Sequence, residues 1–208
     1  LDFSQIELRV GAFYCRDEKM LETYHSGGDI HAQTTSVIYK IPFKEAADKN
    51  NPHYKERRTI AKNCNFGVFY GLFANGLQRT LRFKAGLETT KEECKTIIKN
   101  LKDGYPGLSK WQRETIKTAA NTCFTETWLG RRRYLMGMLS EDWGKRSFAE
   151  RCALNTPIQG TAADILKLAC GRLVAGLPER PWLKPLLQIH DELVFEVPED
   201  KVNDAVRF

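Results

Sequence analysis

The apolar positions along the chain follow a short strand first and then a long series of helices. Residues 2–15 begin as a strand, and the spacing becomes helical at about Gln5. Asp29 and Thr90 are predicted helix N-caps, and Thr90 forms a capping box with Glu93. Helical spacing, interrupted by glycine, proline and asparagine turns, predicts helices over residues 17–24, 29–38, 43–49, 54–70, 75–83, 91–102 and 108–122.

The last third of the chain predicts two hairpins separated by a long helix. Alternating apolar residues over 124–135 and 186–197 predict antiparallel pairs that turn near Gly130 and at His190–Asp191. An apolar face runs through residues 143–175, and Pro157 is expected to kink or restart that helix. The order of strand, helices and hairpins predicts an α+β fold with a small antiparallel sheet, and not a series of βαβ units.

The segment 57–71 carries the most distinctive polar pattern. Read as a helix, it places Arg58, Lys62, Phe66 and Tyr70 at successive i,i+4 steps, so their side chains form one slowly turning stripe. Two cations at one end and two aromatic rings at the other match a nucleoside triphosphate, which has an oligoanion and a flat base. A solvated helix with a basic face and a core-facing aromatic edge is the alternative that this stretch leaves open.

Composition indicates a folded protein. Of the 208 residues, 11% are aromatic and 28% are charged, which is typical of a folded chain. The net charge of +6 favours a polyanionic partner. No apolar run has the length of a membrane span, and no signal peptide is visible. Both ends interrupt a pattern, so we expect a fragment of a longer protein. Reduced, mostly buried thiols are expected, without C-x-x-C spacing, at Cys15, Cys64, Cys94, Cys123, Cys152 and Cys170.

Two carboxylates at opposite ends of the chain are candidates for a metal site. Asp2 lies near the start of the first strand, and Asp191 lies in the last hairpin turn. Brought together, they form a hard-oxygen site suited to one or two Mg²⁺ ions. His190, Asp191 and Glu192 interrupt an otherwise apolar hairpin, which a buried hairpin accepts only with partners. The alternatives are a capping or surface role for Asp2 and a merely exposed turn at residues 190–192.

Five segments, in order, resemble the motifs of family A DNA polymerases. Together they extend over essentially the whole chain. They are residues 2–9 (DFSQIELR), Arg58-x3-Lys62-x7-Tyr70-Gly71, residues 130–134 (GRRRY), residues 155–164 (NTPIQGTAAD) and residues 190–192 (HDE).

This resemblance implies a palm and a fingers subdomain. Residues 1–30 and 124–208 are expected to form two parts of the palm, with its small antiparallel sheet. Residues 31–123 are expected to form mostly helical fingers around a nucleotide-binding helix at about 54–71. The family's thumb and the end of its palm have no counterpart in this sequence, so the resemblance implies a weak grip on duplex DNA.

The resemblance also implies a two-Mg²⁺ catalytic centre. Asp2, Asp191 and the backbone carbonyl of Phe3 are expected to hold the metal, with Glu192 as an accessory carboxylate. Lys62 is placed to give a proton or positive charge to the leaving pyrophosphate.

The implied nucleotide site has a triphosphate end and a sugar–base end. Arg58, Lys62 and His31 are expected at the triphosphate. Phe66 is expected against the sugar and base, with Gln5 also lining the site. Phenylalanine at position 66, where some relatives have tyrosine, implies poor acceptance of nucleotides that lack a 3′-hydroxyl. Tyr70 is expected at the template position, and Glu7 against the 2′ carbon, where it excludes a 2′-hydroxyl.

The implied DNA contacts lie on the second half of the chain. Arg151, Asn155 and Gln159 resemble residues that touch the minor groove of the primer–template, where acceptors are shared by all correct pairs. His190 is expected near the primer terminus. The alternatives are an ordinary polar helix face and a packed turn histidine. Backbone phosphates are the expected partners of Arg131, Arg132 and Arg133, which by themselves read as a solvated charge run.

We therefore predict template-directed DNA synthesis from deoxynucleoside triphosphates on primer–template DNA, by a monomer located at the nucleoid in the cytoplasm and without membrane contact. A nucleic-acid-binding fragment without activity is one alternative. A single-subunit RNA polymerase is another, which Glu7 disfavours because it collides with a ribose. A metal-dependent nuclease also uses paired aspartates but gives no reason for the stripe on segment 57–71.

Overall fold

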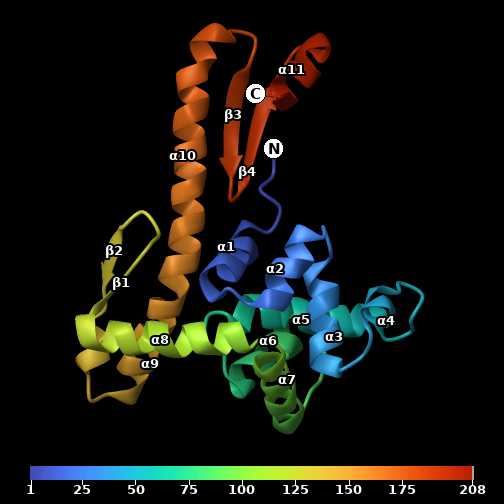
Figure 1. The fold of residues 1–208 in the computed structure, drawn as a ribbon, viewed down its shortest axis with the longest axis vertical. Coiled ribbons are helices and arrows are strands. Elements are labelled where there is room, and N and C mark those ends of the chain that lie inside the picture. The colour runs from blue at the N-terminus through green and yellow to red at the C-terminus, as the bar shows by residue number, and fades with distance from the viewer. Residues whose placement is uncertain (208) are drawn as a thin grey trace.

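The computed structural model describes residues 1–207, which form a helical body with one projecting arm (Figure 1). The arm consists of the far end of α10 (Thr161–Gly176), the hairpin of residues 184–196 and α11 (Val202–Arg207). The helices are α1 (Ile6–Cys15), α2 (Glu18–His25), α3 (Ile30–Tyr39), α4 (Phe43–Ala47), α5 (Tyr54–Val68), α6 (Ala74–Ala85), α7 (Lys91–Gly104), α8 (Pro106–Thr122), α9 (Trp143–Asn155), α10 (Thr161–Gly176) and α11 (Val202–Arg207).

The predicted helix starts are confirmed at two positions. The Asp29 carboxylate accepts hydrogen bonds from the backbone N–H groups of His31 and Ala32, and thereby caps α3. At α7, Thr90 and Glu93 satisfy each other's backbone N–H groups in a reciprocal capping box. Local sequence therefore determines where these helices begin.

The main hydrophobic core lies between α1, α2, α3, α5, α6, α7 and α8. The middle of α5 is buried on one side through Ile60, Ala61, Cys64 and Val68. Leu108 of α8 is among the fully buried side chains of the same core. A smaller cluster lies where α8 meets α9. Because α5 is packed on several sides, its polar stripe has a fixed position relative to the rest of the body.

Both predicted hairpins are present. Strands β1 (Phe124–Glu126) and β2 (Arg132–Tyr134) pair antiparallel around Gly130, whose φ of 81° suits a residue without a Cβ. Strands β3 (Lys184–Ile189) and β4 (Glu192–Glu196) are joined by the two-residue turn His190–Asp191. The α+β prediction, with a small antiparallel sheet, is confirmed, although the strands form two separate pairs within the described chain.

The first residues of the chain lie alongside β4. The Leu1 amino group donates to the Leu193 carbonyl at 2.9 Å, and Leu193 N–H donates back to the Leu1 carbonyl at 2.8 Å. Asp2 stands opposite Glu192 in an antiparallel bridge. The predicted N-terminal strand is therefore a bridge of a few residues, which extends the β3–β4 pair.

Two helix details were not fully predicted by the sequence. Pro157 was expected to kink or restart the helix, and the chain passes it in a π-helical turn over Thr156–Gly160, between the end of α9 and the start of α10. Proline removes one hydrogen bond from the ladder, and the wider spacing of the π turn carries the chain past it. The α-helical part of α5 ends at Val68, and Tyr70 lies in the following turn, with its N–H bonded to the Gly67 carbonyl at 3.1 Å.

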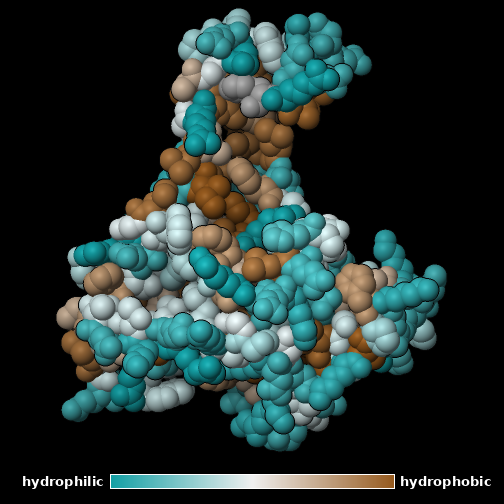
Figure 2. Space-filling view, viewed as in Figure 1, coloured by the Kyte–Doolittle hydropathy of each residue, from teal (hydrophilic) through white to brown (hydrophobic). Residues whose placement is uncertain are grey.

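The arm differs from the body in its apolar surface. Figure 2 shows hydrophobic side chains gathered along it, and the exposed ones include Leu168, Val174, Leu187 and Val194. Within residues 1–207, no helix combines the length and apolarity needed to cross a membrane. All six cysteines are free, as predicted, and four of them are buried.

Candidate functional site

One open cavity of about 750 Å³ brings together predicted residues from distant parts of the sequence. It lies where the start of the chain, α5, the π turn and the β3–β4 turn meet. The predicted site residues that line it are Asp2, Gln5, Glu7, Phe66, Gln159, His190, Asp191 and Glu192. Asp2 and Asp191, from opposite ends of the chain, are thereby brought to one cavity with Phe66 of α5, whereas Arg58, Lys62 and His31 are not among the described residues that line it.

Asp2 lies in the bridge beside β4, Asp191 lies in the β3–β4 turn, and both line the cavity. The Phe3 N–H donates to the Asp191 carbonyl at 3.3 Å, which places Asp2 beside the hairpin turn. One Asp2 oxygen, Oδ1, accepts from the Ser4 N–H at 2.8 Å. Ser4 and Gln5 both have positive φ, at 36° and 60°, so the chain turns sharply from the bridge into α1.

The carboxylates fit a divalent cation by their chemistry. Asp2, Asp191 and Glu192 offer hard carboxylate oxygens at one cavity, and Oδ2 of Asp2 forms no hydrogen bond with the described residues. Residues 1–207 hold no group of three or more His, Cys, Asp or Glu side chains arranged to enclose a metal by themselves. Phe3 is half-buried and packs against the main core.

The two predicted cations of α5 have different surroundings. Arg58 forms an ion pair with Asp29, the residue that caps α3. Burial tends to raise the pKa of Asp29, but hydrogen bonds from Arg58 and from the capped N–H groups lower it overall. Lys62 is exposed and forms no ion pair with any described residue. Lys62 is therefore accessible to a ligand, whereas Arg58 is held at the N-terminus of α3 by its ion pair with Asp29.

His31 lies beside this basic segment and is buried. Its ring centroid is 6.4 Å from that of Phe66, which lines the cavity. The Nδ1 atom of His31 is 2.9 Å from Nδ2 of Asn65 on α5. Burial lowers the pKa of His31, and the positive charges of Arg58 and Lys62 lower it further, against the opposing effect of Asp29. His31 is therefore neutral near pH 7.

Tyr70 holds Glu7 at the edge of the cavity. Its hydroxyl donates to Glu7 Oε2 at 2.5 Å. Burial raises the pKa of Tyr70, and the Glu7 carboxylate raises it further, so the phenol keeps its proton and remains a donor. The Glu7 side chain is thus held in one orientation toward the space next to Phe66.

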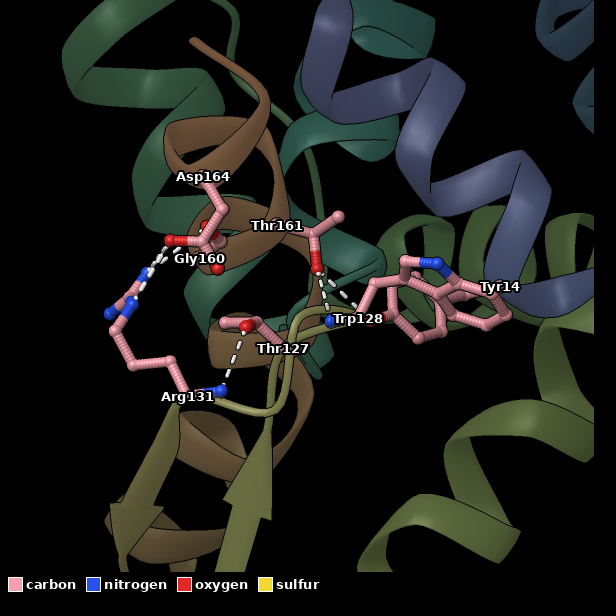
Figure 3. Close-up of polar contacts among 7 residues, drawn as sticks. All are labelled: Tyr14, Thr127, Trp128, Arg131, Gly160, Thr161 and Asp164. Atoms are coloured by element: carbon pink, nitrogen blue, oxygen red, sulfur yellow. Dashed lines mark hydrogen bonds and ion pairs between the residues drawn. The ribbon is translucent and has the colours of Figure 1, made fainter. Parts of the chain in front are cut away.

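The three consecutive arginines make different contacts. Arg131 donates through Nε and Nη2 to Asp164 Oδ1 at 3.0 and 2.9 Å, and through Nη2 to the Gly160 carbonyl (Figure 3). Arg132 pairs with the exposed Glu126 across the hairpin. The Arg133 guanidinium lies 3.5 Å from the Thr156 hydroxyl. All three remain exposed.

The β1–β2 turn is fastened to the start of α10 by a second set of bonds. The Thr161 hydroxyl accepts from the Trp128 N–H at 2.9 Å and lies 3.0 Å from the Tyr14 hydroxyl (Figure 3). Trp128 also contacts the ring of Phe13 edge to face, at 4.8 Å between centroids. The β1–β2 turn therefore contacts both α1 and the start of α10, and these contacts fix its position.

The predicted minor-groove residues follow α9 into the π turn. Arg151 is exposed and donates to the Ser147 hydroxyl at 2.8 Å. Asn155 is half-buried at the end of α9, and Gln159 is exposed within the π turn, where it lines the cavity. Arg151 and Asn155 belong to α9 and Gln159 to the π turn, so the three residues do not share one uninterrupted α-helix.

Sequence reasoning missed several residues that shape the site. Asp29 was expected only as a cap, yet it also holds Arg58. Asn65 and Asp164 were given no site role. Asn65 could have been noticed as the one polar residue on the buried face of α5, with Ala61, Cys64 and Val68. Asp164 is likewise a charge among the buried residues of α10.

Comparison with known proteins decides the family. The model for DNA polymerase family A matches residues 1–208, the whole chain. The chain belongs to DNA polymerase family A.

Curated family A relatives match along nearly the whole chain. The DNA polymerase I of Chloroflexus aurantiacus is 39% identical over 207 residues, which cover 99% of this chain and 20% of the relative. The thermostable DNA polymerase I of Thermus aquaticus is 37% identical over 207 residues, which cover 100% of this chain and 23% of the relative. That of Lactococcus lactis is 38% identical over 98% of the chain and 22% of the relative. The chain thus spans about a fifth of the length of these relatives.

A solved family A structure has the same fold. The POL domain of Pol1 from M. smegmatis, in complex with DNA primer-template and dNTP, superposes with a TM-score of 0.87 at 35% identity. The match covers 99% of this chain and 34% of that chain. Enzymes of this family are generally metal-dependent.

Proposed function

We propose that this chain carries the nucleotidyl-transfer centre of a DNA-directed DNA polymerase. The reaction is attack of a primer 3′-hydroxyl on the α-phosphate of a deoxynucleoside triphosphate, with pyrophosphate as the leaving group. The observation that supports it best is the cavity in which Asp2, Asp191 and Glu192 face Phe66 of α5. Family membership and the likeness to a polymerase bound to primer-template and dNTP support the same reaction.

The carboxylates of Asp2 and Asp191 would hold two Mg²⁺ ions, with Glu192 beside them and the Phe3 carbonyl as a further ligand. Bound Mg²⁺ supplies charge stabilisation for both the attacking and the leaving oxygen. The assignment is supported by the hydrogen bond from Phe3 to the Asp191 carbonyl and by the bridge between Asp2 and Glu192, which bring the two aspartates to one cavity. The turn at Ser4 and Gln5 directs the chain away from the bridge and leaves Asp2 exposed to the cavity.

The triphosphate end of the nucleotide is assigned to the basic end of α5. Lys62, exposed and without an ion pair in the described chain, is free to bind phosphate oxygens and to donate to the leaving pyrophosphate. Arg58 reaches the same region once it shares or releases Asp29. Neutral His31 adds a hydrogen-bond donor between these cations and Phe66.

The sugar and base are assigned to the cavity end of the same helix. Phe66 is 41% exposed, which suits a ring that packs on a nucleotide. Glu7, fixed by the Tyr70 hydroxyl, blocks the space that a 2′-hydroxyl needs. Gln5 lines the same cavity. Tyr70, which donates to Glu7, is proposed beside the template base.

Duplex DNA is assigned to the side formed by α9, the π turn and the two hairpin turns. Arg151, Asn155 and Gln159 are proposed at the minor groove, and His190 at the primer terminus. Arg132 and Arg133 are exposed and suited to backbone phosphates. Arg131 is exposed as well, but its guanidinium is shared with Asp164. Palm segments at 1–30 and 124–208, fingers at 31–123, a monomeric state and a location at the nucleoid in the cytoplasm stay predictions.

The test uses the complete gene product that carries this chain. Asp2→Asn and Asp191→Asn are expected to lower single-turnover nucleotide incorporation by about 10³-fold or more, because each removes one charged ligand of ions that supply several kcal/mol. Primer–template binding is expected to stay within about twofold, since neither aspartate attracts a phosphate backbone. Asp200→Asn, an exposed acidic residue outside the cavity, serves as the control. If Asp191→Asn incorporated nucleotides at the wild-type rate, the assignment of Asp191 as a metal ligand would be wrong.

A further inference from the structure

A line of buried polar side chains runs through the body to His31. Tyr105, between α7 and α8, has its hydroxyl 3.1 Å from that of Thr34 on α3. Thr34 donates to Asn65 Oδ1 at 2.8 Å, and Asn65 Nδ2 is 2.9 Å from His31 Nδ1. The exposed fractions of these residues are 1% for Tyr105, 0% for Thr34, 1% for Asn65 and 6% for His31. Buried polar groups in such a line are costly unless every hydrogen has an acceptor.

Only one direction of hydrogen bonding gives every hydroxyl hydrogen in this line an acceptor among the described residues. If Tyr105 donates to Thr34 and Thr34 donates to Asn65 Oδ1, then Asn65 Nδ2 donates to His31 Nδ1, and each hydroxyl hydrogen has an acceptor. With the amide reversed, Thr34 must donate to Tyr105. The buried Tyr105 hydroxyl hydrogen then has no acceptor among residues 1–207. The lost hydrogen bond favours the first arrangement by about 1–3 kcal/mol.

This direction determines the tautomer of His31. Nδ1 accepts a hydrogen bond, so the proton of the neutral imidazole is on Nε2. Nε2 has no hydrogen bond to the described residues and belongs to a ring placed near Phe66. The charged groups that act on the ring are Asp29, Arg58 and Lys62, and burial keeps the ring neutral near pH 7. With the opposite tautomer, Nε2 would carry a lone pair and could not donate a hydrogen bond to a phosphate oxygen.

We propose that Thr34 and Asn65 are positioning residues that hold His31 as the Nε2–H tautomer, so that it donates a hydrogen bond to a phosphate oxygen of the incoming nucleotide. The phosphate contact rests on the function proposed above, whereas the tautomer rests on the buried line alone. Thr34 acts on the nucleotide without touching it, through its hydrogen bond to Asn65 and the bond from Asn65 to His31.

The first experiment observes the tautomer without any activity. Imidazole ¹⁵N–¹H NMR of the 208-residue chain, with the His31 signals assigned by their loss in His31→Gln, is expected to show protonated Nε2 and unprotonated Nδ1 at neutral pH. Thr34→Val removes the hydroxyl hydrogen that orients the Asn65 amide, and it is expected to give a mixture of both tautomers. Tyr105→Phe is the matched control, because Thr34 keeps Asn65 Oδ1 as its acceptor and the Nε2–H tautomer is expected to persist. Protonated Nδ1 in the wild-type chain would overturn the proposal even if the variants failed to fold.

The second experiment connects the tautomer to the nucleotide in the complete gene product. Thr34→Val is expected to raise the KM for a deoxynucleoside triphosphate about fivefold, the equivalent of one hydrogen bond, with kcat within about twofold. Tyr105→Phe is expected to leave KM within about twofold, because Thr34 still orients Asn65. In a His31→Ala background, Thr34→Val is expected to have no further effect. Equal effects with and without His31 would show a structural role and overturn the proposal.

The two experiments separate the failures. If incorporation is absent from every form of the protein while NMR shows the Nε2–H tautomer, the proposed function fails and the positioning by Asn65 stands. If incorporation is present and the wild-type tautomer is Nδ1–H, the positioning fails and the proposed function stands.

Discussion

The body and the arm of this molecule place site residues in opposite ways. In the body, α5 is surrounded by other helices, and His31, the residue proposed to contact the nucleotide, is the end of a buried line of hydrogen bonds. In the arm, every residue of β3 is exposed, and the hairpin turn that carries Asp191 bonds through its backbone to the first residues of the chain. The proposed nucleotide contact is thus held within a core, and the proposed metal ligands lie on a largely exposed hairpin and the segment beside it.

One helix shows the contrast within itself. The buried residues of α10 lie in its first turns, among them Asp164 and Leu166, and contact the body. Its later turns run along the arm, where Leu168 and Val174 are 50% and 61% exposed. Burial therefore stops at a definite point along one continuous helix. Burial, and with it stability, is therefore concentrated in the body. Truncating a buried side chain there should lower the free energy of unfolding more than truncating an exposed side chain in the arm.

The largest difference is expected between matched leucine truncations. Leu108→Ala, in the body at 0% exposure, is expected to lower the free energy of unfolding by about 3 kcal/mol, because it opens a cavity in a packed core. Leu187→Ala, in β3 at 61% exposure, is expected to change it by about 0.5 kcal/mol or less. Urea unfolding of both variants measures this. Similar losses would mean that the arm is packed as firmly as the body.

An intermediate effect is expected at the junction between the β1–β2 hairpin and α10. Arg131→Met removes the cation that pairs with Asp164. The Asp164 side chain is 8% exposed, and its Oδ2 has no hydrogen bond to the described residues. The expected loss is about 2 kcal/mol, below the value for a fully buried pair because Arg131 is half-exposed. Arg132→Met is the control, since its pair with Glu126 is exposed and worth at most about 1 kcal/mol. Equal losses in the two variants, measured by urea unfolding, would refute the special role of Arg131.

The smallest effect is expected at Asp29, and it depends on pH. Its pKa in the folded chain is lowered, so the carboxylate stabilises the fold above its unfolded value of about 3.9, and this stability is lost as pH falls through the folded pKa. Asp29→Asn keeps an N-cap residue and removes the charge. We expect a loss of about 0.5 kcal/mol at pH 7, because the pair with Arg58 is partly exposed, and none at pH 2.

The unfolding free energy of Asp29→Asn is compared with that of Asp200→Asn at both pH values. Asp200 is exposed and forms no ion pair in the described chain. A loss at Asp29 that persists unchanged at pH 2 would show that the cap, and not the ion pair with Arg58, carries the effect.

Much of this fold follows from local sequence. The caps at Asp29 and Thr90, and the turns at Gly130 and His190–Asp191, were predictable because side-chain chemistry within a few residues determines them. The π turn at Thr156–Gly160 was not, because proline marks a disturbed helix without specifying its geometry. The positive φ values of Ser4 and Gln5 also have no sequence signal, since they result from joining the Asp2–Glu192 bridge to a packed α1.

The candidate site divides in the same way. Pattern and family resemblance named the residues that line the cavity, including Asp2, Phe66 and Asp191. They did not name what holds those residues. The partners of Arg58, His31 and Tyr70 come from positions 29 to 63 residues away in sequence, and only the packing of the body brings them into contact.

The central claim is that Asp2 and Asp191 together hold divalent ions in front of α5. The most direct measurement titrates Mn²⁺ into the ¹⁵N-labelled 208-residue chain and follows paramagnetic broadening of backbone amides. The account predicts early broadening at Glu192 and Phe66, lost in Asp191→Asn and retained in Asp200→Asn. Broadening centred away from the cavity, or unchanged in Asp191→Asn, would contradict it.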